Sequence, residues 1–144
     1  MIGYLLDSSA LWRILRDPKL SDLWRDPVVA GEVHSCYPQR IEFLRSARNR
    51  KEYADYCAMF DALYRDVNVP KSAGSWIAGL QWRAAETGNH QCLSAIDLQI
   101  SATAAHHGLA VIHDDSDFVT AAQLATELRQ LNVHDGPYES ADGS

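Results

Sequence analysis

A chain of 144 residues has room for one hydrophobic core and excludes a second independent domain. Hydrophobic residues make up 47% and charged residues 22%, a globular composition that excludes extensive disorder. The formal net charge of −6 excludes a protein that holds nucleic acid by overall positive charge.

The basic residues are nevertheless unevenly spread, because most of them fall between Arg13 and Lys51. The stretch is compatible with a basic surface beside an acidic site, although such residues more commonly lie on solvated helix faces. Its C-terminal part contains Arg40, Arg45, Arg48, Arg50 and Lys51.

The cysteines and the N-terminus indicate an intracellular setting. Cys36, Cys57 and Cys92 are odd in number and form no CxxC pair, so neither a disulfide framework nor a thiolate zinc site is expected. The start MIGYLLDSSALW has no basic segment before its apolar run, and nothing in the chain approaches transmembrane length. We therefore expect a cytoplasmic protein without membrane association.

The first residues predict a strand followed by two helices. Ile2–Leu6 is a short apolar run typical of a buried strand, and Asp7 or Ser8 is placed to cap a helix that Pro18 ends. A second, short helix is predicted over residues 20–25, before the next proline.

The middle of the chain is predicted to contain mainly helices. Residues 28–36 are ambiguous and hold at most a short strand, whereas Pro38 suits the first turn of a helix and residues 51–64 form another. A brief strand is predicted at 67–69, and a helix that contains Trp76 is predicted to end near Gly88.

The last third of the chain predicts a helix, a strand, a polar loop, a helix and a strand. The helix over residues 98–107 follows an S-x-x-D capping pattern and is ended by Gly108; a strand over 109–112 and a loop over 113–118 come next. A helix at 120–130 and a strand at 131–133 are predicted to complete a domain of residues 1–134, followed by a flexible tail of residues 135–144.

Short apolar strands separated by helices predict an α/β fold with one mostly parallel sheet covered by helices on both faces. Functional groups in such sheets gather at the carboxyl ends of the strands. Asp7 and Asp115 each lie just beyond a predicted strand.

Each acidic residue near these strand ends has a structural explanation when it is considered alone. Asp7 can cap a helix, Asp97 holds the fourth position of the capping pattern, and Glu42 can be solvated on its helix. Together these acids favour a cation-binding site, because grouped carboxylates repel one another unless a cation neutralises them. Hard oxygen ligands suit Mg²⁺ or Mn²⁺, which assist phosphoryl transfer.

Four motifs, in this order, resemble those of PIN-domain nucleases, particularly the VapC toxins of bacterial toxin–antitoxin pairs. They are LLDSSAL around Asp7, RIEFLRSA around Glu42, SAIDLQISATAAHHG around Asp97 and LAVIHDDSDF around Asp115. The third and fourth motifs, with the short gap between them, are the most specific of the set.

The resemblance implies a PIN-like fold and assigns roles to particular residues. Asp7, Glu42, Asp97 and Asp115 would form the catalytic acidic quartet, with Asp7, Asp97 and Asp115 binding a divalent metal. Ser9 matches a small hydroxyl residue expected to hydrogen-bond within the site, and Asp117 matches a further acid that many members carry.

The fourth motif departs from the family pattern, because His113 and Asp114 stand where many relatives carry Thr and Arg. Asp114 adds a second candidate for the fourth acid. Asp115 is preferred because it keeps the D-x-D-F register with Asp117 and Phe118.

The activity that the resemblance implies is metal-assisted hydrolysis of RNA phosphodiester bonds by a homodimeric toxin with a cognate antitoxin. The metal, Mg²⁺ or Mn²⁺, would activate water for attack and offset charge on the scissile phosphate. Two other interpretations remain: a protein-binding module of the same fold without cleavage, and a phosphatase with Asp7 as nucleophile. The phosphatase is disfavoured, because the second acid it needs two residues later is Ser9.

Overall fold

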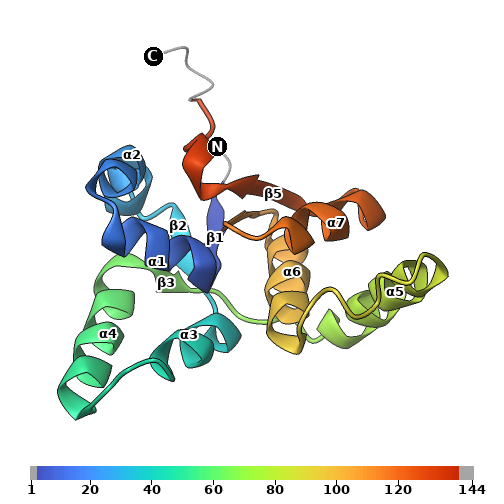
Figure 1. The fold of residues 1–144 in the computed structure, drawn as a ribbon, viewed down its shortest axis with the longest axis horizontal. Coiled ribbons are helices and arrows are strands. Elements are labelled where there is room, and N and C mark those ends of the chain that lie inside the picture. Colours follow the sequence, from blue (N-terminus) through green and yellow to red (C-terminus); the bar gives the residue numbers. More distant parts are fainter. Residues whose placement is uncertain (1–2, 140–144) are drawn as a thin grey trace.

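The computed structural model describes residues 3–139 and contains one parallel sheet with strand order β3-β2-β1-β4-β5 (Figure 1). Every strand pair is parallel, which confirms the predicted α/β class. The strands are β1 (Tyr4–Leu6), β2 (Val33–Ser35), β3 (Arg65–Asp66), β4 (Ala110–His113) and β5 (Arg129–Asn132).

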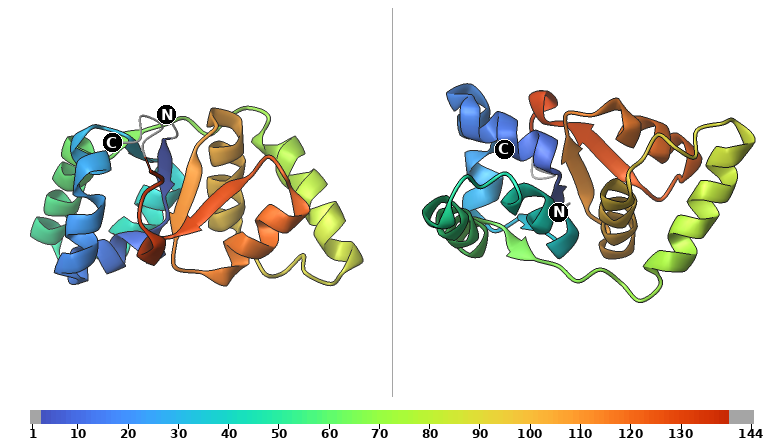
Figure 2. Two further views of the ribbon diagram at one scale, coloured as in Figure 1. Left: turned by 90° about the horizontal axis from the view of Figure 1, so that it is seen from above. Right: turned by 60° about the horizontal axis from the view of Figure 1, so that its bottom comes forward.

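Helices cover both faces of this sheet, as predicted. The views of Figures 1 and 2 place α1, α2 and α4 on one side and α5, α6 and α7 on the other. The helices are α1 (Ser8–Arg16), α2 (Pro18–Val29), α3 (Tyr37–Leu44), α4 (Arg50–Leu63), α5 (Ala73–Glu86), α6 (Ala95–His107) and α7 (Ser116–Leu124).

The alternation of side chains along the central strands produces two cores. Leu6 and Ile112 pack with α1, α2 and α4, whereas Leu5 and Val111 pack with α5, α6 and α7. Side chains alternate between the faces of a strand, so a strand covered on both faces is apolar at every position. The apolar runs of β1 and β4 are a direct consequence.

The predicted second helix was too short. The α2 helix begins at Pro18 because the Asp17 side chain caps it and accepts the Lys19 N–H at 2.9 Å. Pro18 therefore ends α1 and also begins α2, since proline fits the first helical position. The helix then continues through Pro27, which the prediction had placed outside it.

Three other predicted boundaries were wrong. β3 is Arg65–Asp66 rather than 67–69, although the Val67 N–H still donates to Ser35 at 2.8 Å. The α7 helix is Ser116–Leu124 rather than 120–130. The Asp115 side chain caps its start, so half of the expected loop is helical, and Ala125 is its C-cap. β5 correspondingly begins earlier, at Arg129.

The direction in which the chain crosses the sheet reverses between β1 and β4. β2 and β3 extend the sheet on one side of β1, and β4 and β5 extend it on the other. The two loops that follow β1 and β4 therefore diverge over opposite faces and leave a crevice at their carboxyl ends. Asp7 and the residues after His113 lie at this point.

The C-terminal segment packs onto the first strand. After the 3₁₀ turn η1 (Val133–Asp135), the Tyr138 N–H donates to the Tyr4 hydroxyl at 2.8 Å, and the two rings stack with centroids 6.0 Å apart. The Trp24 indole N–H donates to the Val133 carbonyl at 2.9 Å. The remainder of the predicted tail, residues 140–144, lies outside the described residues. Among residues 3–139, no helix has the length and apolar character to cross a membrane.

Gly108 ends α6 in the left-handed conformation, with φ 68°. Gly108→Ala should lower the free energy of unfolding by about 1 kcal/mol, because a Cβ disfavours this conformation. Gly79→Ala in the interior of α5 is the matched control: an added Cβ there meets only Arg83 at 3.6 Å, and helix propensity should raise stability by up to about 1 kcal/mol. Urea denaturation measures both, and equal effects of the two changes would contradict this explanation.

Candidate active site

Four different elements bring the predicted acidic quartet together at the carboxyl end of the sheet. Asp7 follows β1, Asp115 follows β4, Glu42 lies on α3, and Asp97 lies in the first turn of α6. β1 and β4 are hydrogen-bonded neighbours, which is why Asp7 and Asp115 meet. These residues are far apart in the sequence, but the parallel topology brings them to the same edge of the sheet.

The charges of these acids act on one another. Burial, together with the charges of the neighbouring Asp7 and Asp115 carboxylates, raises the pKa of Asp97 to about 6. Burial raises the pKa of Asp7 as well, against the hydrogen bonds from Ser9 and with the charges of Glu42 and Asp115. The pKa of Glu42 is raised by burial and then by Asp97. A site that resists the ionisation of its own carboxylates favours a positive ligand.

Asp7 has one oxygen engaged and one without a partner. Its Oδ2 accepts the Ser9 N–H at 3.1 Å and also the Ser9 hydroxyl, and so caps α1. Its Oδ1 has no hydrogen-bond partner within the described residues, and water cannot easily supply one because the residue is only 4% exposed. A buried, unsatisfied carboxylate oxygen is costly, and a hard cation is the ligand that would satisfy it.

The donor set therefore fits a divalent cation, although the ligands are not closed around one point. Within residues 3–139, no three Asp, Glu, His or Cys side chains are grouped tightly enough to hold a metal ion as they stand. Side-chain rotation toward a cation would be needed to complete the shell.

The two adjacent acids of the fourth motif point to different surroundings. Asp114 pairs with Arg13 at 2.7 Å and accepts from Asn132 at 3.2 Å, and these contacts lower its pKa, with the Asn132 hydrogen bond as the largest cause. The charge of Asp115 acts instead on Asp7, Asp97 and Asp117. The geometry thus favours Asp115 as the fourth acid.

Ser9 joins the first motif to the fourth. Its hydroxyl donates to Asp7 and accepts the backbone N–H of Asp114 at 2.9 Å. The expected hydrogen bond within the site is present, and the serine also fixes the loop that carries Asp115.

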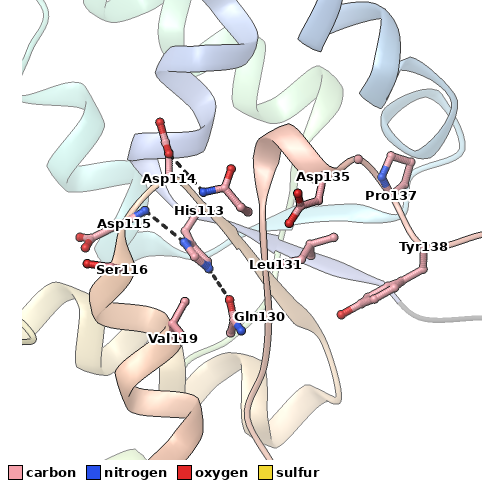
Figure 3. Close-up of a pocket in the computed structure, with 12 residues that line it drawn as sticks. His113, Asp114, Asp115, Ser116, Val119, Gln130, Leu131, Asp135, Pro137 and Tyr138 are labelled. Carbon is pink, nitrogen blue, oxygen red and sulfur yellow. Dashed lines mark hydrogen bonds between the residues drawn. The ribbon is translucent and has the colours of Figure 1, made fainter.

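His113 makes contacts that the sequence did not predict. Its Nδ1 accepts the Asp115 N–H at 3.1 Å, and its Nε2 lies 2.6 Å from the Gln130 Oε1 (Figure 3). The ring is 1% exposed and packs against Phe118. The replacement of Thr by His in the fourth motif was the only signal, and it did not indicate Gln130, which lies on a different strand.

Several residues of the basic stretch have roles other than a basic surface beside the site. Arg40 is buried, donates to Ser35 at 2.7 Å and to the Tyr64 carbonyl at 2.9 Å, and so ties α3 to β2 and α4. Arg48 pairs with Glu52, and Lys51 with Asp55, along α4. These residues have structural or helix-surface roles.

The pKa of Asp97 predicts how stability depends on pH. A carboxyl whose folded pKa of about 6 exceeds its ordinary value of 3.8 stabilises the fold while it is protonated, and this contribution is lost as pH rises between these values. Thermal melts in EDTA should therefore show wild-type stability falling over this window relative to Asp97→Asn. If the melting temperatures of the two proteins change in parallel with pH across this window, the raised pKa of Asp97 is contradicted. Added Mg²⁺ should restore stability at the upper end.

The sequence matches the PIN domain family over residues 4–124. It is 47% identical to ribonuclease VapC6 of Mycobacterium tuberculosis over 101 aligned residues, and this alignment covers 70% of this chain and 80% of the relative. The fold is similar to VapBC2 of Rickettsia felis, bound to a DNA fragment from its promoter, with TM-score 0.71, 12% identity and coverage of 92% and 98%. It is also similar to VapBC-5 of M. tuberculosis, a toxin–antitoxin family member, with TM-score 0.61, 23% identity and coverage of 92% and 99%.

Proposed function

Because the chain belongs to the PIN-domain family and its relatives include VapC ribonucleases, we propose that it is a metal-dependent endoribonuclease and the toxin of a VapBC-type module. The observation that carries this proposal is the meeting of Asp7, Glu42, Asp97 and Asp115, each of a different element, at the carboxyl edge of the sheet. The non-cleaving binding module is not favoured, since no member of the quartet is missing.

Asp7, Asp97 and Asp115 would hold the divalent cation, Mg²⁺ or Mn²⁺. When bound, the cation would supply Lewis-acid chemistry at a phosphodiester and make water more acidic. The unpartnered Oδ1 of Asp7 and the raised pKa values of Asp7 and Asp97, caused first by burial, support this assignment.

The chain's own residues prepare the site for this chemistry. Ser9 holds Asp7 in one rotamer through two hydrogen bonds, and the Ser9 hydroxyl also fixes the loop before Asp115. Glu42 is close enough to Asp7 and Asp97 for their charges to act on one another, and there it would orient a water molecule or accept its proton. Its pKa is raised, first by burial and also by the Asp97 charge, and this favours proton uptake.

The partners follow from the family and from the charge of the site. An antitoxin segment that carries Arg or Lys would complement the carboxylates and compete with the cation. We also propose an RNA substrate, a homodimer and a cytoplasmic setting, for which the three free cysteines are suited.

The test is cleavage of total cellular RNA by the purified protein with Mg²⁺, with Mn²⁺ and with EDTA. Discrete fragments that require metal are expected, and Asp97→Asn should yield none, which excludes a contaminating nuclease. Folded protein, freed of any antitoxin, that cuts no RNA with either metal would refute the enzyme and return the binding module to first place.

A further inference from the structure

The imidazole of His113 lies between the acidic site and the last strand of the sheet, and the proposed chemistry makes no use of it. His113 is the last residue of β4, is 1% exposed, and packs against Phe118 of α7 with ring centroids 5.2 Å apart. Figure 3 shows both ring nitrogens in hydrogen bonds, one to Asp115 and one to Gln130 of β5. A buried ring with both nitrogens engaged has a fixed orientation.

The two hydrogen bonds determine which nitrogen of His113 carries the hydrogen. The Nδ1 atom accepts the backbone N–H of Asp115 at 3.1 Å, so Nδ1 carries no hydrogen and the ring is neutral. The hydrogen therefore lies on Nε2, which donates to the Gln130 Oε1 at 2.6 Å. The opposite tautomer would set the Nδ1 hydrogen against the N–H of Asp115.

Gln130 is placed for this contact by the register of the sheet. It is the cross-strand partner of Val111, and residues 111 and 113 of β4 point to the same face. That face packs against α7, so the side chains of Gln130 and His113 meet diagonally on it. Gln130 also lines a pocket of about 680 Å³, together with Asp135 and Tyr138, where water can reach its NH₂ group.

The bond to His113 fixes the backbone from which the Asp115 carboxylate extends. Asp115 is the N-cap of α7, and its Oδ1 accepts the Asp117 N–H at 2.9 Å. One end of the residue is thus held by the ring and one oxygen by the helix. Within residues 3–139 the other oxygen, Oδ2, receives no hydrogen bond, which leaves it available to a cation.

We propose that His113 is a positioning residue for Asp115, acting through its acceptor atom Nδ1; the inference rests on the proposed metal-dependent function. The residue touches neither the cation nor the RNA. It holds the main chain of Asp115, and the Gln130 amide holds the ring. Partners that orient a metal ligand in this way change metal affinity or activity by roughly 10–100-fold when they are replaced.

The competing interpretation is that the His113 ring only fills the space between β4, β5 and α7. Two substitutions separate these roles. In His113→Asn the amide oxygen is bonded to Cγ, as Nδ1 is in histidine, so an acceptor for the Asp115 N–H remains although most of the ring is lost. In His113→Leu most of the bulk remains and the acceptor is lost. Positioning predicts that asparagine is the better replacement, whereas space filling predicts leucine.

The tautomer is measured first, on the wild-type protein in EDTA at mildly alkaline pH. Imidazole ¹⁵N chemical shifts from NMR distinguish a nitrogen that carries hydrogen from one that does not. The hydrogen of His113 should lie on Nε2. A hydrogen on Nδ1 would overturn the proposal without any variant, because Nδ1 could not then accept the N–H of Asp115.

The affinity for Mn²⁺ is then measured by calorimetry on the folded proteins without RNA. His113→Leu should weaken binding about tenfold or more, whereas His113→Asn should stay closer to wild type. His106→Leu is the matched control, because His106 is exposed near the end of α6 opposite Asp97 and should leave the affinity unchanged. Equal affinities of the two His113 variants, or tighter binding by His113→Leu, would overturn the proposal.

RNA cleavage separates this proposal from the function on which it rests. The Mg²⁺ concentration for half-maximal cleavage should rise about tenfold or more in His113→Leu, and the rate at saturating Mg²⁺ should change less. Wild-type Mg²⁺ dependence in that variant would refute the positioning role while the nuclease stands. A wild-type protein that cuts no RNA, but whose Mn²⁺ affinity falls in His113→Leu and is kept in His113→Asn, would refute the nuclease and keep the positioning role.

Discussion

Asp7→Asn should lower RNA cleavage by about a thousandfold or more and leave the protein as stable as wild type, or more stable, in EDTA. The loss follows because a charged ligand of the cation is removed, and Lewis-acid stabilisation amounts to several kcal/mol. Stability is retained because the asparagine oxygen can still accept the Ser9 N–H and cap α1. The gain follows because burial and the charges of Glu42 and Asp115 oppose ionisation of Asp7.

Asp17→Asn is the matched control for this change. Asp17 caps α2 as Asp7 caps α1, accepting the Lys19 N–H at 2.9 Å, but it lies on an exposed surface. The same chemical change there should leave cleavage unchanged. Single-turnover cleavage and thermal melting measure the two effects separately. Asp7→Asn activity within tenfold of wild type would remove Asp7 from the site, and a lower melting temperature would make its role mainly structural.

Asp115→Asn and Asp114→Asn should differ by at least about a hundredfold in cleavage. Asp115 interacts with the charges of Asp7 and Asp97, so its neutralisation removes a second ligand of the cation. Asp114 is held away from the cluster by Arg13 and Asn132. Its neutralisation should cost less than about 1 kcal/mol of stability, because the Arg13 pair is solvent-exposed.

The comparison has one further readout. Metal-induced thermal stabilisation should be reduced in Asp115→Asn and kept in Asp114→Asn. The reverse order of the two variants, in cleavage and in metal response, would make Asp114 the fourth acid. Equal losses in both would indicate that the loop, rather than one carboxylate, controls the site.

The fold class was predictable because its signal is local. The apolar runs before Asp7 and before His113 fit strands that are buried on both faces, and the helical periods between them require parallel crossovers. The errors at α2 and α7 have a common cause. Asp17 and Asp115 cap helices that begin two residues before their first buried apolar residue, Leu20 and Phe118, so the apolar period began later than the helix itself.

The sequence by itself determined the α/β class, the acidic residues at strand ends and the family motifs, because periodicity and motif spacing are properties of neighbouring residues. Only the tertiary structure showed that Asp114 pairs with Arg13, that Arg40 lies buried in a hydrogen-bond network, and that His113 contacts Gln130. It also placed Asp135 and Tyr138 beside Asp115. These outcomes depend on which strands pair and which side chains they bring into contact, and such long-range contacts leave no period in the sequence.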